Sequence, residues 1–224
     1  MTEEEWLKCA DSQKMLGFLQ QRLLSGRKKR LLVCAACRLI WPLITDARSR
    51  EVVEVAERFA EGQATVMELE IARAEARAAI PTRHPSRGVS VGGKEWRIAR
   101  LRHSVTRAAW YTATNPISSI TAIRSVGEIA QQRGLASSSV IPLLLRCISG
   151  NPFSPVAINP TWLTSNVASL AQAIYQEKAF DRLPILADAL EDAGCNSQDI
   201  LSHCRQPGVH VRGCWVVDTV LGKE

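Results

Sequence analysis

Apolar side chains recur every three or four residues along most of this 224-residue chain, which is the period of an amphipathic α-helix. Residues that favour helix starts precede several of these runs. Thr2 and Thr65 are each followed three positions later by a glutamate, which forms a capping box, and Asp11 and Asp46 can each cap a further helix. Pro81 disfavours helix in the residue before it, so the last of these helices must end before Pro81. The sequence therefore predicts five helices within residues 3–80.

The third of these helices carries a stripe of apolar residues at steps of three and four. The stripe consists of Cys34, Cys37, Trp41 and Ile44, and this spacing places the four side chains on one helix face. Pro42 lies inside the stripe, and we expect it to kink or end the helix.

Glycine and proline are concentrated in residues 81–94, which contain few large apolar residues and are expected to be a loop or linker. Helical patterns resume beyond it, over 95–113, 117–133, 137–149, 161–178, 183–193 and 197–205. The last segment, 211–221, fits either a helix or a buried strand, and helix is preferred because every neighbouring segment is helical.

The expected fold is all-α and bundle-like, with about nine helices that form either one core or two packed subdomains. The expected organisation is an N-terminal helical domain (1–80), a linker or loop (81–94), a basic central helical section (95–136) and a C-terminal helical module (137–224). The apolar fraction of 46% is large enough for a real core.

Composition bears on the cellular compartment. The first residues, Met1 to Trp6, are acidic and lack the features of a secretory signal, and charged or amide residues interrupt every apolar run before it could span a membrane. The cysteines are odd in number, seven, which favours reduced thiols over a disulfide framework. We therefore expect a cytoplasmic protein without membrane insertion.

Two parts of the sequence resemble a family of uncharacterised paralogous proteins that occurs in many copies in planctomycete bacteria. The first part, residues 1–79, contains MTEEEWLKCADSQKML, RKKRLLVCAACRLIW and TDARSREVVEVAERFAEGQAT. The second, residues 150–224, contains GNPFSPV, AIYQEKAFDRLPILADALEDAGC, ILSHCR and HVRGCWVVDTVLGKE. The resemblance implies a compact helical domain, and it supplies no catalytic or binding residues that could be transferred to this chain.

The net charge of +6 arises entirely within residues 81–110, where seven basic residues accompany one acidic residue. Arginine can neutralise phosphates, and tryptophan can stack on unpaired bases. The candidates for binding nucleic acid or an acidic partner are Arg83, Arg87, Lys94, Arg97, Arg100, Arg102, Arg107, Trp96 and Trp110. The alternative is that these charges are solvated or paired internally, with Glu68, Glu70 and Glu75 as candidate partners.

A second basic run begins the helix that follows Gly26. It comprises Arg27, Lys28, Lys29 and Arg30, and these side chains lie at the positive end of the expected helix dipole. A bound phosphate would relieve this unfavourable placement, although screening by solvent would relieve it as well.

Five potential metal ligands lie close together near the C-terminus: Cys195, His203, Cys204, His210 and Cys214. Zinc would accept four nitrogen or sulfur ligands, but only the pair His210 and Cys214 approaches a usual ligand spacing. Cysteine is also a frequently buried small residue, so all seven thiols could belong to the core without any metal. A structural zinc ion remains one of the alternatives, and no other cofactor is expected.

We find no defensible catalytic signature in the sequence, which has no complete P-loop motif. The acidic residues Asp188, Glu191 and Asp192 lie on the polar side of an amphipathic helix, where solvated carboxylates are common. The favoured function is therefore a non-enzymatic protein-interaction or accessory subunit of a cytoplasmic assembly. A nucleic-acid-binding accessory protein and a small structural zinc-binding protein are the alternatives.

Overall fold

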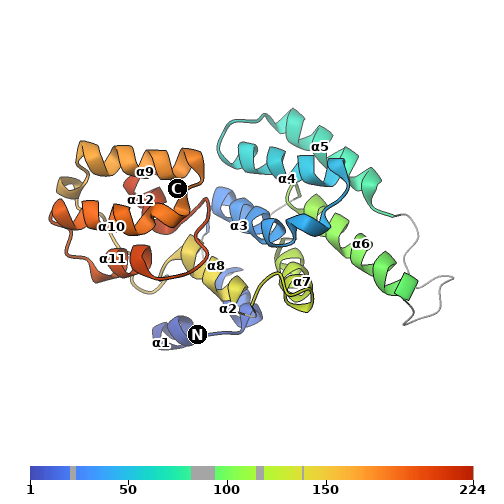
Figure 1. The fold of residues 1–224 in the computed structure, drawn as a ribbon, viewed down its shortest axis with the longest axis horizontal. Coiled ribbons are helices and arrows are strands. Elements are labelled where there is room, and N and C mark those ends of the chain that lie inside the picture. Colours follow the sequence, from blue (N-terminus) through green and yellow to red (C-terminus); the bar gives the residue numbers. More distant parts are fainter. Residues whose placement is uncertain (21–23, 82–93, 115–118, 138, 224) are drawn as a thin grey trace. The chain divides into compact units, whose positions relative to one another are not determined.

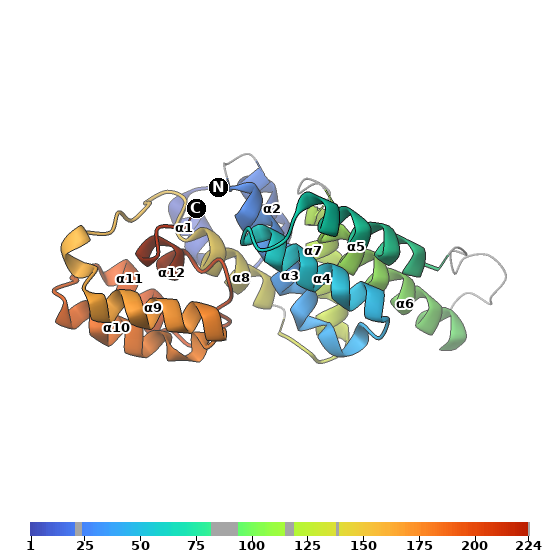
Figure 2. The same cartoon turned by 90° about the horizontal axis from the view of Figure 1, so that it is seen from above.

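The computed structural model of the chain describes residues 1–20, 24–81, 94–114, 119–137 and 139–223. Within these ranges the chain forms twelve α-helices and a few short 3-10 helices, and no β-strand (Figures 1 and 2). Ten of the helices are seven residues or longer. The predicted all-α class is confirmed, and the number of longer helices is close to the nine expected.

The helices follow the chain in a simple order. The N-terminal half contains α1 (Glu3–Lys8), α2 (Ser12–Gln20), α3 (Gly26–Leu39), α4 (Ala47–Ala60), α5 (Val66–Ala79) and α6 (Lys94–Tyr111). The C-terminal half contains α7 (Ser119–Gln132), α8 (Val140–Ser149), α9 (Ser165–Glu177), α10 (Leu183–Asp192), α11 (Gln198–Arg205) and α12 (Trp215–Val220). The segment over 211–221, for which a strand was the alternative, thus contains a helix.

Local sequence signals explain where several helices begin. In the first capping box the Thr2 amide donates to a Glu5 carboxylate oxygen at 2.7 Å, and the Glu5 amide donates to the Thr2 hydroxyl at 3.2 Å. Thr65 and Glu68 form the same pair of bonds at the start of α5. These contacts satisfy amides that the first turn of a helix leaves without a partner, so both predicted capping boxes are confirmed.

Helix α3 ends before Pro42, as the sequence predicts. It stops at Leu39, and residues Trp41–Leu43 continue as a single turn of 3-10 helix with Pro42 in its first turn. Of the expected apolar stripe, Cys34, Cys37 and Ile44 are at most 1% exposed, whereas Trp41 is half-buried. Because α3 ends at Leu39, Trp41 and Ile44 lie beyond it, and the four residues do not share one helix face.

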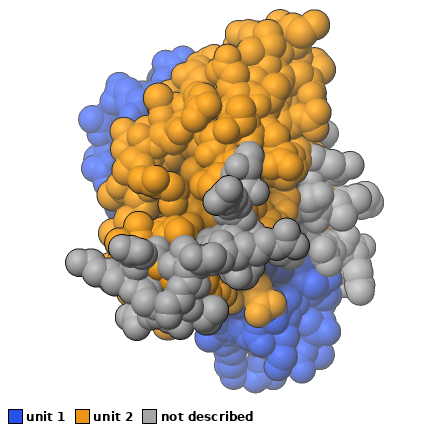
Figure 3. All heavy atoms as spheres, turned by 90° about the vertical axis from the view of Figure 1, so that its right-hand side faces the viewer, with its two compact units in different colours: residues 1–18, 142–224 blue, residues 19–141 orange. Residues whose placement is uncertain are grey.

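The chain forms two compact units, which Figure 3 colours separately. One unit contains Met1–Phe18 and Pro142–Glu224, and the other contains Leu19–Ile141. This grouping differs from the expected one, because residues 1–18 associate with the C-terminal part rather than with the helices that directly follow them. The central section, 95–136, shares a unit with α3, α4 and α5.

In the Leu19–Ile141 unit, α4 packs against both α3 and α5, while α6 and α7 pack on each other and α3 contacts both. Small side chains such as Ala36, Ala56 and Ala109 are fully buried and allow the helices to approach closely. An arginine from α3 also reaches a distant part of this unit, since Arg30 donates to the Thr112 carbonyl at 2.6 Å.

In the other unit, α9 and α10 lie side by side (Figures 1 and 2). Val167, Ile174 and Leu186 are fully buried in the core that these helices share with α11 and α12. The N-terminal segment is fastened by Arg146 of α8, which donates to the Trp6 carbonyl at 2.7 Å and to the Cys9 carbonyl at 2.6 Å. The unit is therefore built from the two ends of the chain.

None of the helices in the described ranges combines the length and the apolar character that a membrane crossing requires.

Candidate metal centre

Four potential metal ligands converge in the unit formed by Met1–Phe18 and 142–224. Cys147 lies near the end of α8, His203 lies in α11, His210 lies in the segment between α11 and α12, and Cys214 directly precedes α12. Their ligand atoms all lie within 4.8 Å of one another. Cys147, His203 and Cys214 are buried and His210 is half-buried, so the cluster lies mostly within the core.

Two sulfur–nitrogen distances in the cluster match those around a tetrahedral ion. Zinc bound about 2.3 Å from sulfur and about 2.0–2.1 Å from nitrogen would separate a sulfur from a nitrogen ligand by about 3.6 Å. The Cys147 sulfur lies 3.7 Å from Nδ1 of His210, and the Cys214 sulfur lies 3.3 Å from Nε2 of His203. Two thiols and two imidazoles are also a common donor set for structural zinc.

The backbone around Cys214 turns its thiol inward. Gly213 adopts a left-handed conformation with φ of 87°, which is accessible to glycine at little cost. The Cys214 amide donates to the Val211 carbonyl at 3.0 Å, and the Cys214 carbonyl accepts the first backbone bond of α12 from Asp218 at 2.9 Å. The cysteine is thus fixed between a tight turn and a helix.

A second left-handed glycine shapes the other side of the cluster. Gly150 follows α8 with φ of 64°, and a Cβ atom added there would lie 3.1 Å from Cγ of Trp215. The Trp215 ring in turn contacts His203, with 5.3 Å between ring centroids. Gly150 therefore allows Trp215 to approach closely, and Trp215 in turn helps to hold His203 in position.

The surroundings of Cys214 favour the thiolate that binds metals, whereas those of His210 favour its protonated form. Burial acts to raise the pKa of the Cys214 thiol, but hydrogen bonds from Cys147, His203 and His210 hold this pKa well below its usual value. Burial acts to lower the pKa of His210, but its contacts with Cys214 and the Gln206 carbonyl raise it overall. The cluster is thus arranged around a thiolate, which is the form of cysteine that binds metals.

Both histidines also contact Gln206, which follows α11. Nε2 of His210 lies 3.4 Å from the Gln206 carbonyl oxygen, and Nδ1 of His203 lies 3.2 Å from the Gln206 side-chain amide. Histidines that bind metals usually donate the proton of their other ring nitrogen to such a group, which fixes the ring orientation. A half-turn of the Gln206 amide would present its oxygen to His203.

Of the five ligands proposed from the sequence, the structure brings together His203, His210 and Cys214. Cys195 and Cys204 are buried in the core of the same unit but lie outside the cluster. Burial raises the pKa of the Cys204 thiol, as expected for a core cysteine. The ligand that the sequence did not indicate is Cys147, because it lies far upstream and only the tertiary fold brings it close.

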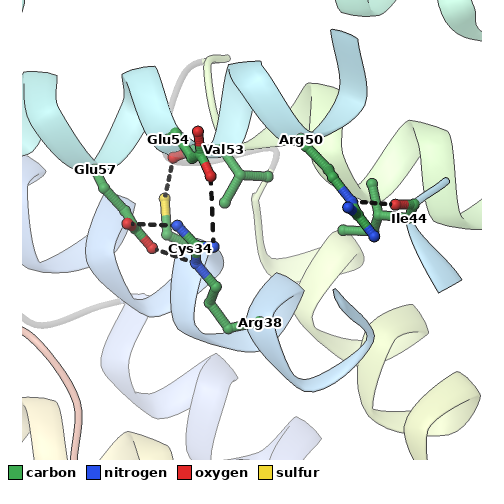
Figure 4. Close-up of polar contacts among 7 residues, drawn as sticks. All are labelled: Cys34, Arg38, Ile44, Arg50, Val53, Glu54 and Glu57. Atoms are coloured by element: carbon green, nitrogen blue, oxygen red, sulfur yellow. Dashed lines mark hydrogen bonds and ion pairs between the residues drawn. The ribbon is translucent and has the colours of Figure 1, made fainter. Parts of the chain in front are cut away.

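The Cys34-x-x-Cys37 pair has a different environment, of which Figure 4 shows Cys34 with Arg38 and Glu57. The Cys34 thiol donates to the Val53 carbonyl at 3.8 Å, and burial raises the pKa of Cys34 well above its usual value and that of Cys37 to about 12. Beside them, Arg38 forms two hydrogen bonds to the Glu57 carboxylate, at 2.9 and 2.8 Å. These thiols therefore belong to the core.

The basic run at the start of α3 is partly used internally. Arg27 forms an ion pair with Glu61 at 3.0 Å, and Arg30 is bound to the Thr112 carbonyl and lies over the Phe59 ring. These contacts engage two of the four residues proposed as a phosphate site, which weakens that interpretation.

The central basic candidates divide into three groups. Arg83 and Arg87 lie outside the described residues. Lys94 and Arg97 belong to α6, but their side chains are not among those that the structure describes. The side chains that it describes belong to Trp96, Arg100, Arg102, Arg107 and Trp110, all on α6. Among the described residues, Arg100, Arg102 and Arg107 form no ion pair with Glu68, Glu70 or Glu75, the partners considered from the sequence.

Comparison of the chain with protein-family models, with curated proteins and with solved structures finds no match.

Proposed function

We propose that the protein binds one structural zinc ion through Cys147, His203, His210 and Cys214. The observation that carries this proposal is the convergence of the four ligand atoms within 4.8 Å of one another, at sulfur–nitrogen spacings close to those of a tetrahedral zinc site. Two thiolates would balance the charge of a divalent ion, so that a buried centre carries no net charge.

The ligand chemistry favours zinc over harder divalent ions. Thiolate and imidazole are soft to borderline donors, whereas magnesium and calcium require oxygen ligands. Catalytic zinc sites commonly keep one position for water or substrate, and structural sites are closed by four protein ligands. The four ligands here would complete a tetrahedron, which supports a structural rather than a catalytic ion.

The ion would fasten α8 to the C-terminal end of the chain. Cys147 belongs to α8, and the other three ligands lie on or between α11 and α12. Because the unfolded chain cannot hold such a site together, the free energy of metal binding contributes directly to folding. We therefore propose that zinc stabilises this unit.

The wider role that we propose is non-enzymatic binding, as a protein-interaction or accessory subunit of a cytoplasmic assembly. A closed ligand set supports it, because the ion would have no position left for a substrate. All seven cysteines are free of disulfide bonds, and a reducing compartment would keep the metal ligands available. Efficient metal-independent turnover by the purified protein would contradict this role.

Cobalt substitution tests the metal proposal. The purified chain, treated with a chelator and reloaded with Co²⁺, should bind one ion and show the visible absorption of a tetrahedral thiolate site, which zinc then abolishes. Cys147→Ser and Cys214→Ser should each lose this spectrum. Cys204→Ala is the matched control, because it removes a buried thiol from the same core without removing a ligand.

The outcomes separate the proposal from its alternative. Retention of the full spectrum and stoichiometry by Cys147→Ser would contradict the assigned ligand set. Failure of the folded wild-type chain to bind cobalt or zinc would show that the four residues are an ordinary part of the core.

A further inference from the structure

One face of α6 carries alternating aromatic and basic side chains. Trp96, Arg100, His103, Arg107 and Trp110 follow one another at steps of four, three, four and three residues. At 3.6 residues per turn, this spacing keeps all five within about 40° of the Trp96 direction on the helix. We name this set the α6 stripe. At a rise of about 1.5 Å per residue, it extends for about 21 Å.

The stripe is accessible along its whole length. Arg100 and Arg107 are exposed, and Trp96, His103 and Trp110 are half-buried. A surface helix normally places large aromatic residues against the core, so two half-exposed tryptophans on the same face as two arginines are unusual for a helix that only packs.

The surface is hollowed at both ends of the stripe. Near its C-terminal end, a hollow of about 770 Å³ lies between α5 and α6, and its lining includes Arg77, His103, Arg107, Trp110 and Tyr111. Near its N-terminal end, a hollow of about 580 Å³ lies between α6 and α7, and its lining includes Trp96, Arg100 and Arg133. Both volumes fall in the range of ligand sites, about 300–1,000 Å³.

The charge of these hollows is suited to an anion. Arg77 and Arg107 line the first hollow, and no carboxylate is among its lining residues. Among the described residues, neither arginine forms an ion pair. The second hollow contains one carboxylate, Glu128, which is paired with Arg124 at 3.0 Å. The charges of the stripe itself are therefore not neutralised by the described carboxylates.

Aromatic contacts hold the arginines in place. Arg77 lies over the Trp110 ring at 5.6 Å, and Arg100 lies over the Trp96 ring at 5.1 Å. Arg107 donates to the Tyr111 hydroxyl at 2.7 Å and lies over the same ring. Each guanidinium is thus oriented before a ligand arrives, which lowers the entropy cost of binding. In addition, the Trp96 indole N–H is buried and has no hydrogen-bond partner among the described residues.

We infer that the α6 stripe, together with Arg77 of α5, binds single-stranded nucleic acid, with phosphates at Arg77, Arg100 and Arg107 and bases stacked on Trp96 and Trp110. Single-strand binding surfaces combine a basic track with aromatic side chains on which bases stack. Two aromatic and basic hollows along one helix face fit a strand better than a single mononucleotide. A duplex fits poorly, because its bases are already stacked.

The test is fluorescence anisotropy with labelled 20-nucleotide oligo-dT and oligo-U, using the full-length protein. For single strands, the slope of the logarithm of affinity against the logarithm of salt concentration is about −0.7 per phosphate contact. Three contacts therefore predict that affinity falls roughly 20-fold between 50 and 200 mM salt. Arg107→Gln should weaken binding and lower the slope by about 0.7. Trp110→Leu should weaken binding about 5- to 150-fold through lost stacking, provided that thermal unfolding shows it remains folded.

Arg102→Gln is the matched control. Arg102 is exposed on the same helix, lies about a third of a turn from the stripe and lines neither hollow, so its removal changes the net charge equally. Near-normal binding by this variant, together with loss in Arg107→Gln, would support the stripe. Equal loss in both variants would overturn it, because binding would then depend on overall charge alone.

Two further arms identify the ligand. Adenosine monophosphate should compete only weakly with the oligonucleotides, and the matching duplex should bind more weakly than the single strand. Competition by the mononucleotide at the affinity of the strand, or preference for the duplex, would overturn the assignment. This inference is independent of the zinc site, whose ligands lie in the other unit.

Discussion

Gln206 offers a sharp test of the metal centre, because its side chain touches a proposed ligand without being one. Its amide lies 3.2 Å from Nδ1 of His203, while Nε2 of the same ring faces the Cys214 sulfur. If His203 binds zinc through Nε2, Nδ1 carries a proton and requires an acceptor, which the amide oxygen of Gln206 can supply. Gln206→Met keeps much of the side-chain volume and removes that acceptor.

The expected loss of zinc affinity follows from similar hydrogen bonds to metal-bound histidines in other proteins. Removal of a group that orients a metal-bound histidine typically lowers metal affinity about 10- to 100-fold, which corresponds to about 1.4–2.7 kcal/mol. The backbone contact between His210 and the Gln206 carbonyl should survive, since the substitution leaves the backbone intact. Gln206→Glu supplies a charged acceptor and should therefore bind zinc at least as well as the wild type does.

The assay is competition for zinc between the protein and a chromophoric chelator of known affinity. Gln198→Met, an exposed glutamine at the other end of α11, is the matched control and should bind zinc like the wild type. An affinity of Gln206→Met within about threefold of the wild type, well below the typical effect of about 10- to 100-fold, would refute the reasoning about His203.

Three further predictions concern the surrounding structure. Arg146→Met should reduce the free energy of unfolding by about 2–4 kcal/mol in urea titrations, because two charge-assisted hydrogen bonds to the N-terminal segment are lost. Gly150→Ala should lower the free energy of unfolding by about 1–2 kcal/mol, because alanine is strained in the left-handed backbone conformation. The contact of its Cβ with Trp215 should lower that free energy further, as the same titrations would measure. Cys34 and Cys37 should resist alkylation at pH 8 in the native protein, because burial raises the pKa of both thiols, and mass spectrometry of digested protein would detect any modification.

Each of these has a matched comparison. Arg205→Met removes exposed ion pairs to Asp188 and Glu191 and should change stability little. Gly222 has the same φ of 64°, but a Cβ atom added there would meet no other atom within 4 Å. If Gly222→Ala lowers the free energy of unfolding as much as Gly150→Ala does, the contact with Trp215 is unimportant. The half-exposed Cys9 should be alkylated under conditions that leave Cys34 and Cys37 intact, and equal modification of all three would contradict their core placement.

The parts of the fold that the sequence predicted depend on local interactions. The capping boxes at Thr2 and Thr65 involve residues three positions apart, and the end of α3 follows from the ring of Pro42. Such signals need no knowledge of distant contacts. The grouping of Met1–Phe18 with the C-terminal part does need them, since it depends on Arg146 reaching the carbonyls of Trp6 and Cys9.

The candidate site shows the same limit. His203, His210 and Cys214 are close in the sequence and were recognised together, although their spacing matches no usual zinc motif. Cys147 and the orienting role of Gln206 could not be recognised, because α8 and the turn after α11 meet only in the folded unit. Cys195 and Cys204 satisfied the same local criterion and, like Cys214, are buried in the core, so only their positions in the folded unit, outside the group of four, distinguish them.

The most direct test of the zinc centre is X-ray absorption at the zinc edge of the purified, zinc-loaded protein. The ligand set predicts two sulfur neighbours at about 2.3 Å and two nitrogen neighbours at about 2.0–2.1 Å, in four-coordinate geometry. Cys147→Ser should reduce the sulfur count to one. A first shell of only nitrogen and oxygen, or six-coordinate zinc in the wild type, would contradict the assignment of Cys147, His203, His210 and Cys214 as its ligands.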